Sequence, residues 1–256
     1  MEKVGRFEDG VSIVEVKPVE GRDLIFVEGF PDVGLVGTIA AFYLIDKLGL
    51  EEVGYVDAEL LPPIVSIRNE QIKELIRIYH KGNLVAIVSD IPIPPAMIRP
   101  LGRSLVSWVE GKSGKLLLSL SGIPEPNRLD IDKPQIFVLG SRPKVTEMLI
   151  KMDGAKRFKD GFITGIKGVM LKEAARAGLD AAIILAQAHY NYPDPGAASQ
   201  LVLYLSKLLH VDVDVKPLLE SAEELKLRLR DLMRRTDRVM QGVQKSKELE
   251  LPPVYL

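Results

Sequence analysis

The chain of 256 residues contains no cysteine, and this absence removes several kinds of chemistry at once. Without thiols there is no disulfide framework, no thiolate zinc site and no cysteine nucleophile. A chain without cysteine suits a reducing compartment, so we expect a cytoplasmic protein.

Long apolar runs and an excess of one charge are also absent. No uninterrupted apolar run approaches the roughly 18 residues of a membrane-spanning helix, and the charged N-terminus lacks the apolar region of a signal peptide. Lys and Arg number 34, and Asp and Glu number 35, so no overall positive field gathers nucleic acid or an anionic membrane. We therefore expect neither nucleic acid nor a membrane among the partners.

Short apolar runs alternate with stretches of helical spacing along most of the chain. The predicted buried strands are residues 24–28, 84–89, 116–120, 135–139 and 181–186. The predicted helices are residues 38–48, 97–110, 144–152, 165–178 and 197–209. Residues 52–80 instead indicate an excursion of exposed antiparallel strands. This order predicts a three-layer α/β/α domain over residues 1–216, with a mixed, largely parallel sheet.

A glycine-rich turn from Gly29 to Gly37 joins the first buried strand to the first long helix. Such a turn gathers the N–H groups of a helix N-terminus, so it either holds an anion or lets the helix pack closely on the sheet. The P-loop pattern is absent because Leu35 and Val36 follow Gly34, and Gly-x-Gly-x-x-Gly is absent as well. We favour the packing interpretation, expect no cofactor, and keep an anion site as the alternative.

Candidate catalytic side chains are few. Of the three histidines, only His189 lies in a loop after a buried strand, where α/β active sites gather, and Asp194 could orient it as a base. Ser89 or Ser121 could then serve as the nucleophile. However, no serine lies in Gly-x-Ser-x-Gly and no histidine has metal-binding spacing. A hydrolase is therefore the weaker interpretation, and we expect no catalytic or metal-binding residue.

Residues 217–249 predict one long charged helix with Pro217 in its first turn. Its apolar positions recur at alternating intervals of four and three, which is the repeat of a coiled-coil seam with one polar break. These positions are Leu218, Ala222, Leu225, Leu229, Leu232, Thr236, Val239 and Val243. Two interpretations stay open, since the seam either pairs with a helix of another chain or packs on its own domain.

The sequence ends in Pro-Pro-Val-Tyr-Leu, and we predict that residues 250–256 are a flexible docking tail. The two prolines stiffen the approach, which lowers the entropy lost when the last three residues enter a pocket. The carboxylate of Leu256 adds a charge for a lysine or a backbone nest. The predicted partner-binding residues are Val254, Tyr255 and Leu256.

Four stretches resemble the proteasome assembly chaperone 2 family in its archaeal form. They are residues 29–37, 118–122, 165–174 and 189–198. The resemblance implies a fold similar to that of purine nucleoside phosphorylases, without a phosphorylase active site, and action without ATP. It also implies that Val254, Tyr255 and Leu256 match the hydrophobic-Tyr-any ending that inserts between α-subunits of the core proteasome.

We therefore expect a non-enzymatic, homo-oligomeric assembly chaperone or adaptor whose partners are proteasome α-subunits or the core proteasome. Several tails on one assembly would raise the effective concentration of a weak three-residue motif. Two other classes stay open. One is a phosphorylase- or hydrolase-like enzyme with an anion site between Gly29 and Gly37, and the other is a scaffold that binds a different protein through the seam helix.

Overall fold

The structure is a computed structural model that describes residues 3–6, 10–152 and 154–250, with side chains for 10–152 and 154–242. The strands are β1 (Lys3–Arg6), β2 (Val11–Glu15), β3 (Ile25–Gly29), β4 (Glu51–Ala58), β5 (Ser66–Arg68), β6 (Gln71–Lys73), β7 (Ile76–Lys81), β8 (Leu84–Ser89), β9 (Leu116–Pro124), β10 (Ile136–Gly140), β11 (Ala155–Arg157) and β12 (Ala181–Ala188). The α-helices are α1 (Val36–Leu48), α2 (Ile98–Gly111), α3 (Pro143–Ile150), α4 (Gly165–Ala177), α5 (Pro195–Leu209), α6 (Lys216–Glu220) and α7 (Ala222–Glu250).

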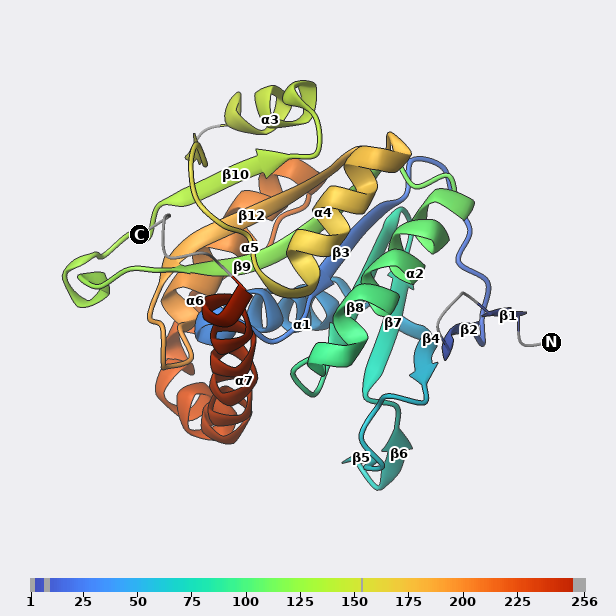
Figure 1. The fold of residues 1–256 in the computed structure, drawn as a ribbon. Coiled ribbons are helices and arrows are strands. Elements are labelled where there is room, and N and C mark those ends of the chain that lie inside the picture. Colours follow the sequence, from blue (N-terminus) through green and yellow to red (C-terminus); the bar gives the residue numbers. More distant parts are fainter. Residues whose placement is uncertain (1–2, 7–9, 153, 251–256) are drawn as a thin grey trace.

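Ten strands form one mixed sheet in the order β1-β2-β4-β7-β8-β3-β9-β12-β10-β11 (Figure 1). The four central strands, β8, β3, β9 and β12, are parallel to one another. Antiparallel pairs flank this centre, from β8 through β7 and β4 to β2 on one side and between β12 and β10 on the other. The predicted mixed α/β sheet is confirmed.

Successive residues of the central strands pack into two cores on opposite faces of the sheet. Phe26 belongs to the core that includes residues of α2 and α4, whereas Val27 belongs to the core that includes residues of α1 and α5. Leu117 and Leu118 on β9 alternate in the same way. Because both faces are covered, these strands are mostly apolar, and the predicted three-layer architecture is confirmed.

The glycine turn lets α1 lie close to the sheet. A Cβ atom on Gly37 would overlap the carbonyl oxygen of Leu120 on β9, and one on Gly29 would overlap the Cβ atom of Ala41 on α1. Gly34, in the short 3-10 helix η2 (Val33–Leu35), has a φ of 61°, in the left-handed region that glycine tolerates best. These contacts support the packing interpretation of the turn.

Two parts of the fold differ from the prediction. Within the excursion predicted over residues 52–80, β5 and β6 form a separate two-stranded sheet and do not join the main one. The single helix expected from residue 217 is interrupted at Ser221, which separates α6 from α7. Ser221 Oγ donates a hydrogen bond to the carbonyl oxygen of Pro217 at 2.8 Å, and such side-chain bonds compete with regular helix.

Among the helices of the described part of the chain, none combines the length and the apolarity needed to span a bilayer.

Candidate functional site

The predicted docking residues Val254, Tyr255 and Leu256 lie outside the described residues. Their role stays a prediction. In the described residues, buried basic side chains lie at three other places. These are the glycine turn, the loop after β12, and the base of the β5–β6 hairpin.

At the glycine turn, Lys167 of α4 is buried with two carboxylates. Its Nζ atom lies 2.9 Å from Oε1 of Glu28 and 3.4 Å from Oδ2 of Asp32, and it also donates to the carbonyl oxygen of Phe30 at 3.2 Å. Ser121, on β9, donates a hydrogen bond to the Asp32 carboxylate. One ammonium group therefore serves two carboxylates at the carboxyl end of β3.

The charge of this cluster opposes the binding of an anion. Burial raises the pKa of Asp32 to about 6, although Lys167 and Ser121 act in the opposite direction. Burial acts to lower the pKa of Lys167, but the charges and hydrogen bonds of Asp32 and Glu28 outweigh burial and raise this pKa above its ordinary value. Oε2 of Glu28 and Oδ1 of Asp32 are buried without a hydrogen-bond partner among the described residues. Because two carboxyl groups surround the one ammonium group, the cluster offers an anion no unpaired positive charge, and the alternative of an anion site between Gly29 and Gly37 loses its electrostatic basis.

The cavity beside this cluster is small. Its volume is about 110 Å³, and Thr236, Val239 and Met240 of α7 form one wall. Pockets for drug-sized ligands and cofactors usually enclose about 300 to 1,000 Å³. A nucleoside does not fit this space, which weakens the phosphorylase-like alternative further.

The candidate pair of His189 and Asp194 is not formed by the two side chains, because the Asp194 carboxylate accepts hydrogen bonds from other donors. It accepts hydrogen bonds from Nε and Nη2 of Arg128 at 2.8 and 3.0 Å, and it caps α5 by accepting the Ala197 N–H at 2.9 Å. Only the backbone N–H of His189 reaches it, at 3.1 Å. The imidazole instead packs edge to face with Tyr192, and burial lowers its pKa.

The two candidate nucleophiles, Ser89 and Ser121, likewise form hydrogen bonds with groups other than His189. Ser89 is buried and donates to the carbonyl oxygen of Ile91 at 2.7 Å, and Ser121 donates to Asp32. Within the described ranges, no group of three or more His, Asp or Glu side chains is arranged to hold a metal ion. The described residues thus assemble neither a serine–histidine pair nor a metal site.

The seam of α7 packs on its own domain. Leu225, Leu229 and Leu232 are partly buried against the core that includes α1 and α5, and Thr236 is fully buried. The Thr236 hydroxyl donates to the carbonyl oxygen of Leu232 at 2.9 Å, so the polar break in the repeat is satisfied within the helix. Of the two interpretations left open, the described residues show the seam packed on its own domain.

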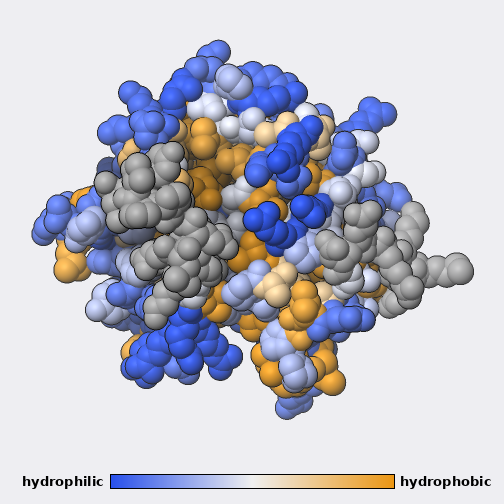
Figure 2. Space-filling model, in the orientation of Figure 1, coloured by the Kyte–Doolittle hydropathy of each residue, from blue (hydrophilic) through white to orange (hydrophobic). Residues whose placement is uncertain are grey.

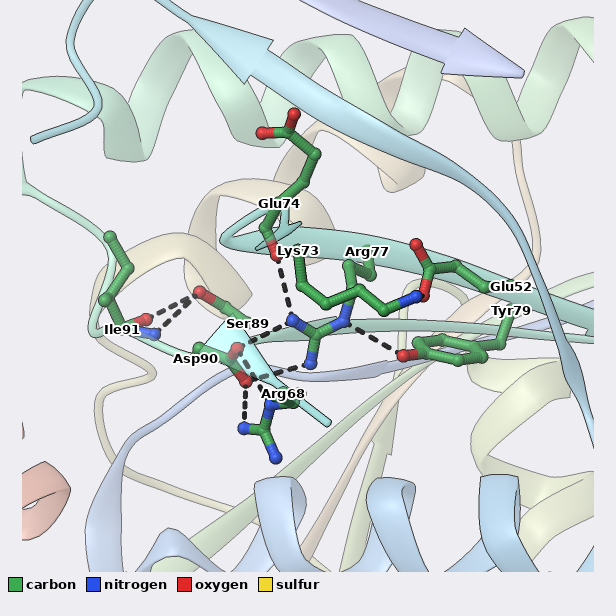
Figure 3. Close-up of polar contacts among 9 residues, drawn as sticks. All are labelled: Glu52, Arg68, Lys73, Glu74, Arg77, Tyr79, Ser89, Asp90 and Ile91. Carbon is green, nitrogen blue, oxygen red and sulfur yellow. Dashed lines mark hydrogen bonds and ion pairs between the residues drawn. The ribbon is translucent and has the colours of Figure 1, made fainter. Parts of the chain in front are cut away.

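A buried ion pair that the sequence did not predict lies at the base of the β5–β6 hairpin. Arg77, on β7, is 1% exposed and donates two hydrogen bonds to Asp90, at 2.6 and 2.9 Å. Arg68, on β5, donates to the same carboxylate at 2.7 Å. Figure 3 shows both guanidinium groups directed at Asp90. The only local signal is Arg77 itself, which stands between two buried isoleucines, Ile76 and Ile78.

Further contacts fix the same base. Nζ of Lys73, on β6, lies 2.9 Å from Oε2 of Glu52, and Arg77 also donates to the Tyr79 hydroxyl at 2.9 Å. Burial would raise the pKa of Asp90, but the hydrogen bonds and charges of its arginine partners hold it below its ordinary value. Asp90 is therefore ionised at neutral pH, and it joins β5 to β7 through two arginines.

The fold and these clusters define a three-layer α/β protein whose described charged groups fix loops, helix ends and a hairpin. A family model described as the PAC2 family matches residues 26–233, and the chain belongs to that family. Pyrococcus furiosus PbaA, described as an archaeal homolog of proteasome-assembly chaperone, is 33% identical and superposes with a TM-score of 0.83 over 90% of this chain and 99% of its own.

Two further relatives cover most of both chains. The uncharacterized protein MJ0106 of Methanocaldococcus jannaschii is 28% identical over 248 residues, which are 97% of this chain and 99% of the relative. Pyrococcus furiosus PbaB, described as an archaeal proteasome activator, is 22% identical, with a TM-score of 0.74 over 88% of this chain and 99% of its own. The likeness to PbaB shows a shared fold.

Proposed function

We propose that this protein is a cytoplasmic, ATP-independent chaperone or adaptor of the proteasome, and not an enzyme. The observation that carries the proposal is the 33% identity, over 90% of the chain, to a protein described as a homolog of a proteasome-assembly chaperone. The absence of nucleotide-binding motifs and the structural use of His189, Asp194 and Ser121 agree with this role. The partners are proteasome α-subunits or the core proteasome.

The C-terminal tail makes the contact. In this scheme Val254 fills the apolar end of a pocket between α-subunits, Tyr255 orders the residues around it, and the carboxylate of Leu256 meets a lysine. The backbone of α7 is helical to Glu250, and its last ten residues span about 15 Å along the helix axis.

Homo-oligomerisation completes the proposal. A motif of three residues binds weakly, and several copies on one assembly raise its effective concentration when their spacing matches the pockets. The affinity of the assembly should therefore fall steeply when it is dissociated into single chains, even though each chain keeps its tail.

Binding to purified α-subunits tests the tail directly. We expect full-length protein to retain α-subunits in a pull-down, and protein without residues 254–256 to lose them. A variant with one glycine added after Leu256 provides the matched control for the carboxylate, since it keeps all three side chains and displaces only the terminal charge. Equal retention by the full-length and truncated proteins would refute the tail mechanism.

A further inference from the structure

Helix α7 differs from the other long helices in how it is attached to the domain. Each of α1 to α5 contains a side chain that is hydrogen-bonded to a different segment of the chain, and these side chains are Tyr43, Trp108, Thr146, Lys167 and Tyr204. In the described part of α7, every hydrogen bond and ion pair of a side chain joins two residues of the helix itself. The attachment of α7 to the domain therefore depends on apolar packing.

The apolar packing of α7 is also sparse. Over residues 222–242 only Met233 and Thr236 are buried, whereas nine of the 15 residues of α5 are buried. The three leucines of the seam are partly buried. Figure 2 shows hydrophilic surface at the lower left of the molecule, where Figure 1 places the lower part of α7. A helix that buries so few side chains gains little stability from the hydrophobic effect.

Three cavities adjoin α7 and interrupt its contact with the domain. Thr236, Val239 and Met240 form one wall of the cavity of about 110 Å³ beside Lys167. A second cavity, of about 640 Å³, lies between α1 and α7, and a third, of about 460 Å³, lies between α7 and the loop after β12. The side chains around a void lack the contacts that a filled interior provides. These spaces therefore weaken the packing that holds the helix on the domain.

The segment directly before α7 is attached more firmly. Leu218, on α6, is 3% exposed, and the hydroxyl of Tyr43 on α1 donates a hydrogen bond to the carbonyl oxygen of Asp214 at 2.6 Å. Ser221 then separates α6 from α7. Hinges in proteins are a few residues at the ends of elements, where changes in φ and ψ are absorbed. Ser221 has such a position, because the firmly attached part of the chain ends there and the sparsely packed helix begins.

We propose that α7 is a hinged arm, which detaches from the domain as a unit at Ser221 while the sheet and helices α1 to α6 stay folded. Regions with few buried apolar contacts open at a lower free energy than the core of the same protein. The packed arrangement is the closed state of the arm. Opening uncovers the leucine seam and the cavity beside Asp32 and Lys167 without unfolding the core. The inference goes beyond the proposed function and concerns the isolated protein, so either can fail without the other.

The absence of cysteine from the chain allows a test by thiol labelling. Thr236→Cys places a single thiol under the closed arm, where Thr236 is 0% exposed. The matched control is Ser206→Cys on α5, because the Ser206 hydroxyl, like that of Thr236, donates to the carbonyl oxygen four residues earlier. Ser206 is 7% exposed, so exposure in the closed state favours labelling of the control.

We expect N-ethylmaleimide to label Thr236→Cys at least about 100-fold faster than Ser206→Cys under native conditions, because the arm opens more often than the core. The rate for Thr236→Cys should depend only weakly on urea, since detachment of one helix exposes much less surface than unfolding of the domain. Equal rates for the two variants overturn the proposal. A rate for Thr236→Cys that rises with urea as steeply as global unfolding does so as well.

Hydrogen exchange of the unmodified full-length chain tests the arm without any substitution. We expect the amides of residues 226–240 to exchange as one group, at least about 100-fold faster than the amides of α5. Exchange that slows steadily from residue 240 toward residue 226 would indicate fraying from one end, and it would overturn the hinge at Ser221. Exchange of α7 at the rate of α5 would overturn the arm itself.

Discussion

Replacing Arg77 with methionine should destabilise the protein more than the loss of any exposed arginine. The substitution removes two hydrogen bonds to Asp90 and leaves that carboxylate buried with Arg68 as its remaining cationic partner. Breaking a buried ion pair by removing one partner typically costs about 3 to 5 kcal/mol. Because the Arg68 side chain is 54% exposed and still pairs with Asp90, we expect a value near the lower limit, about 3 kcal/mol.

Thermal and urea denaturation at fixed protein concentration measure this loss. For a chain of this size, about 3 kcal/mol lowers Tm by roughly 6 to 12 °C. The control is Arg176→Met on α4, since the Arg176 side chain is 60% exposed and such surface pairs contribute at most about 1 kcal/mol. The double variant Arg77→Met/Asp90→Asn should lose less stability than the two single variants lose in sum, because it leaves neither the Arg77 charge nor the Asp90 charge buried without its partner. A loss below about 1 kcal/mol for Arg77→Met would show that the pair does not hold the hairpin base.

Three further predictions concern the glycine turn and the loop after β12. Asp32 has a folded-state pKa of about 6 against an ordinary value of 3.8, so the folded state binds its proton more tightly. Stability should therefore fall by up to about 3 kcal/mol as pH rises from 3.8 to 6, and Asp32→Asn should flatten that fall in urea titrations across this range. Gly37→Ala should destabilise by about 1 to 3 kcal/mol or more, whereas Gly111→Ala, whose added Cβ meets nothing within 4 Å, should be neutral or mildly stabilising. Asp194→Ala should cost about 3 to 5 kcal/mol, because it removes the cap of α5 and leaves Arg128 buried without its carboxylate. The same change at exposed Asp46 should cost less than about 1 kcal/mol in the same denaturation assay.

Patterns among residues that are neighbours in the sequence predicted the turns, strands and helices, because these elements depend on contacts between such neighbours. The glycine turn is one case, because Gly29, Gly34 and Gly37 mark a close approach and a left-handed residue directly. The alternation of buried strands and helices is another, since each strand of the parallel centre is rich in short apolar runs. The break at Ser221 was missed because the apolar repeat continues across it from α6 to α7.

The charged clusters were not predictable in the same way, because their members are far apart in the chain. Lys167 and Glu28 are separated by 139 residues, and Arg128 and Asp194 by 66. No spacing rule connects such pairs, and each alone resembles a surface charge. Asp194 illustrates the error. Its position near His189 suggested a catalytic pair. In the structure, however, the Asp194 carboxylate caps the N-terminus of α5 and accepts hydrogen bonds from Arg128.

The seam of α7 shows why periodicity does not identify a partner. Apolar residues at alternating intervals of four and three indicate that one face of a helix is buried. Either a helix of another chain or the core of the same domain can cover that face. Here Leu225, Leu229 and Leu232 pack on their own domain, so in this arrangement their stripe is not free to pair with a second α7.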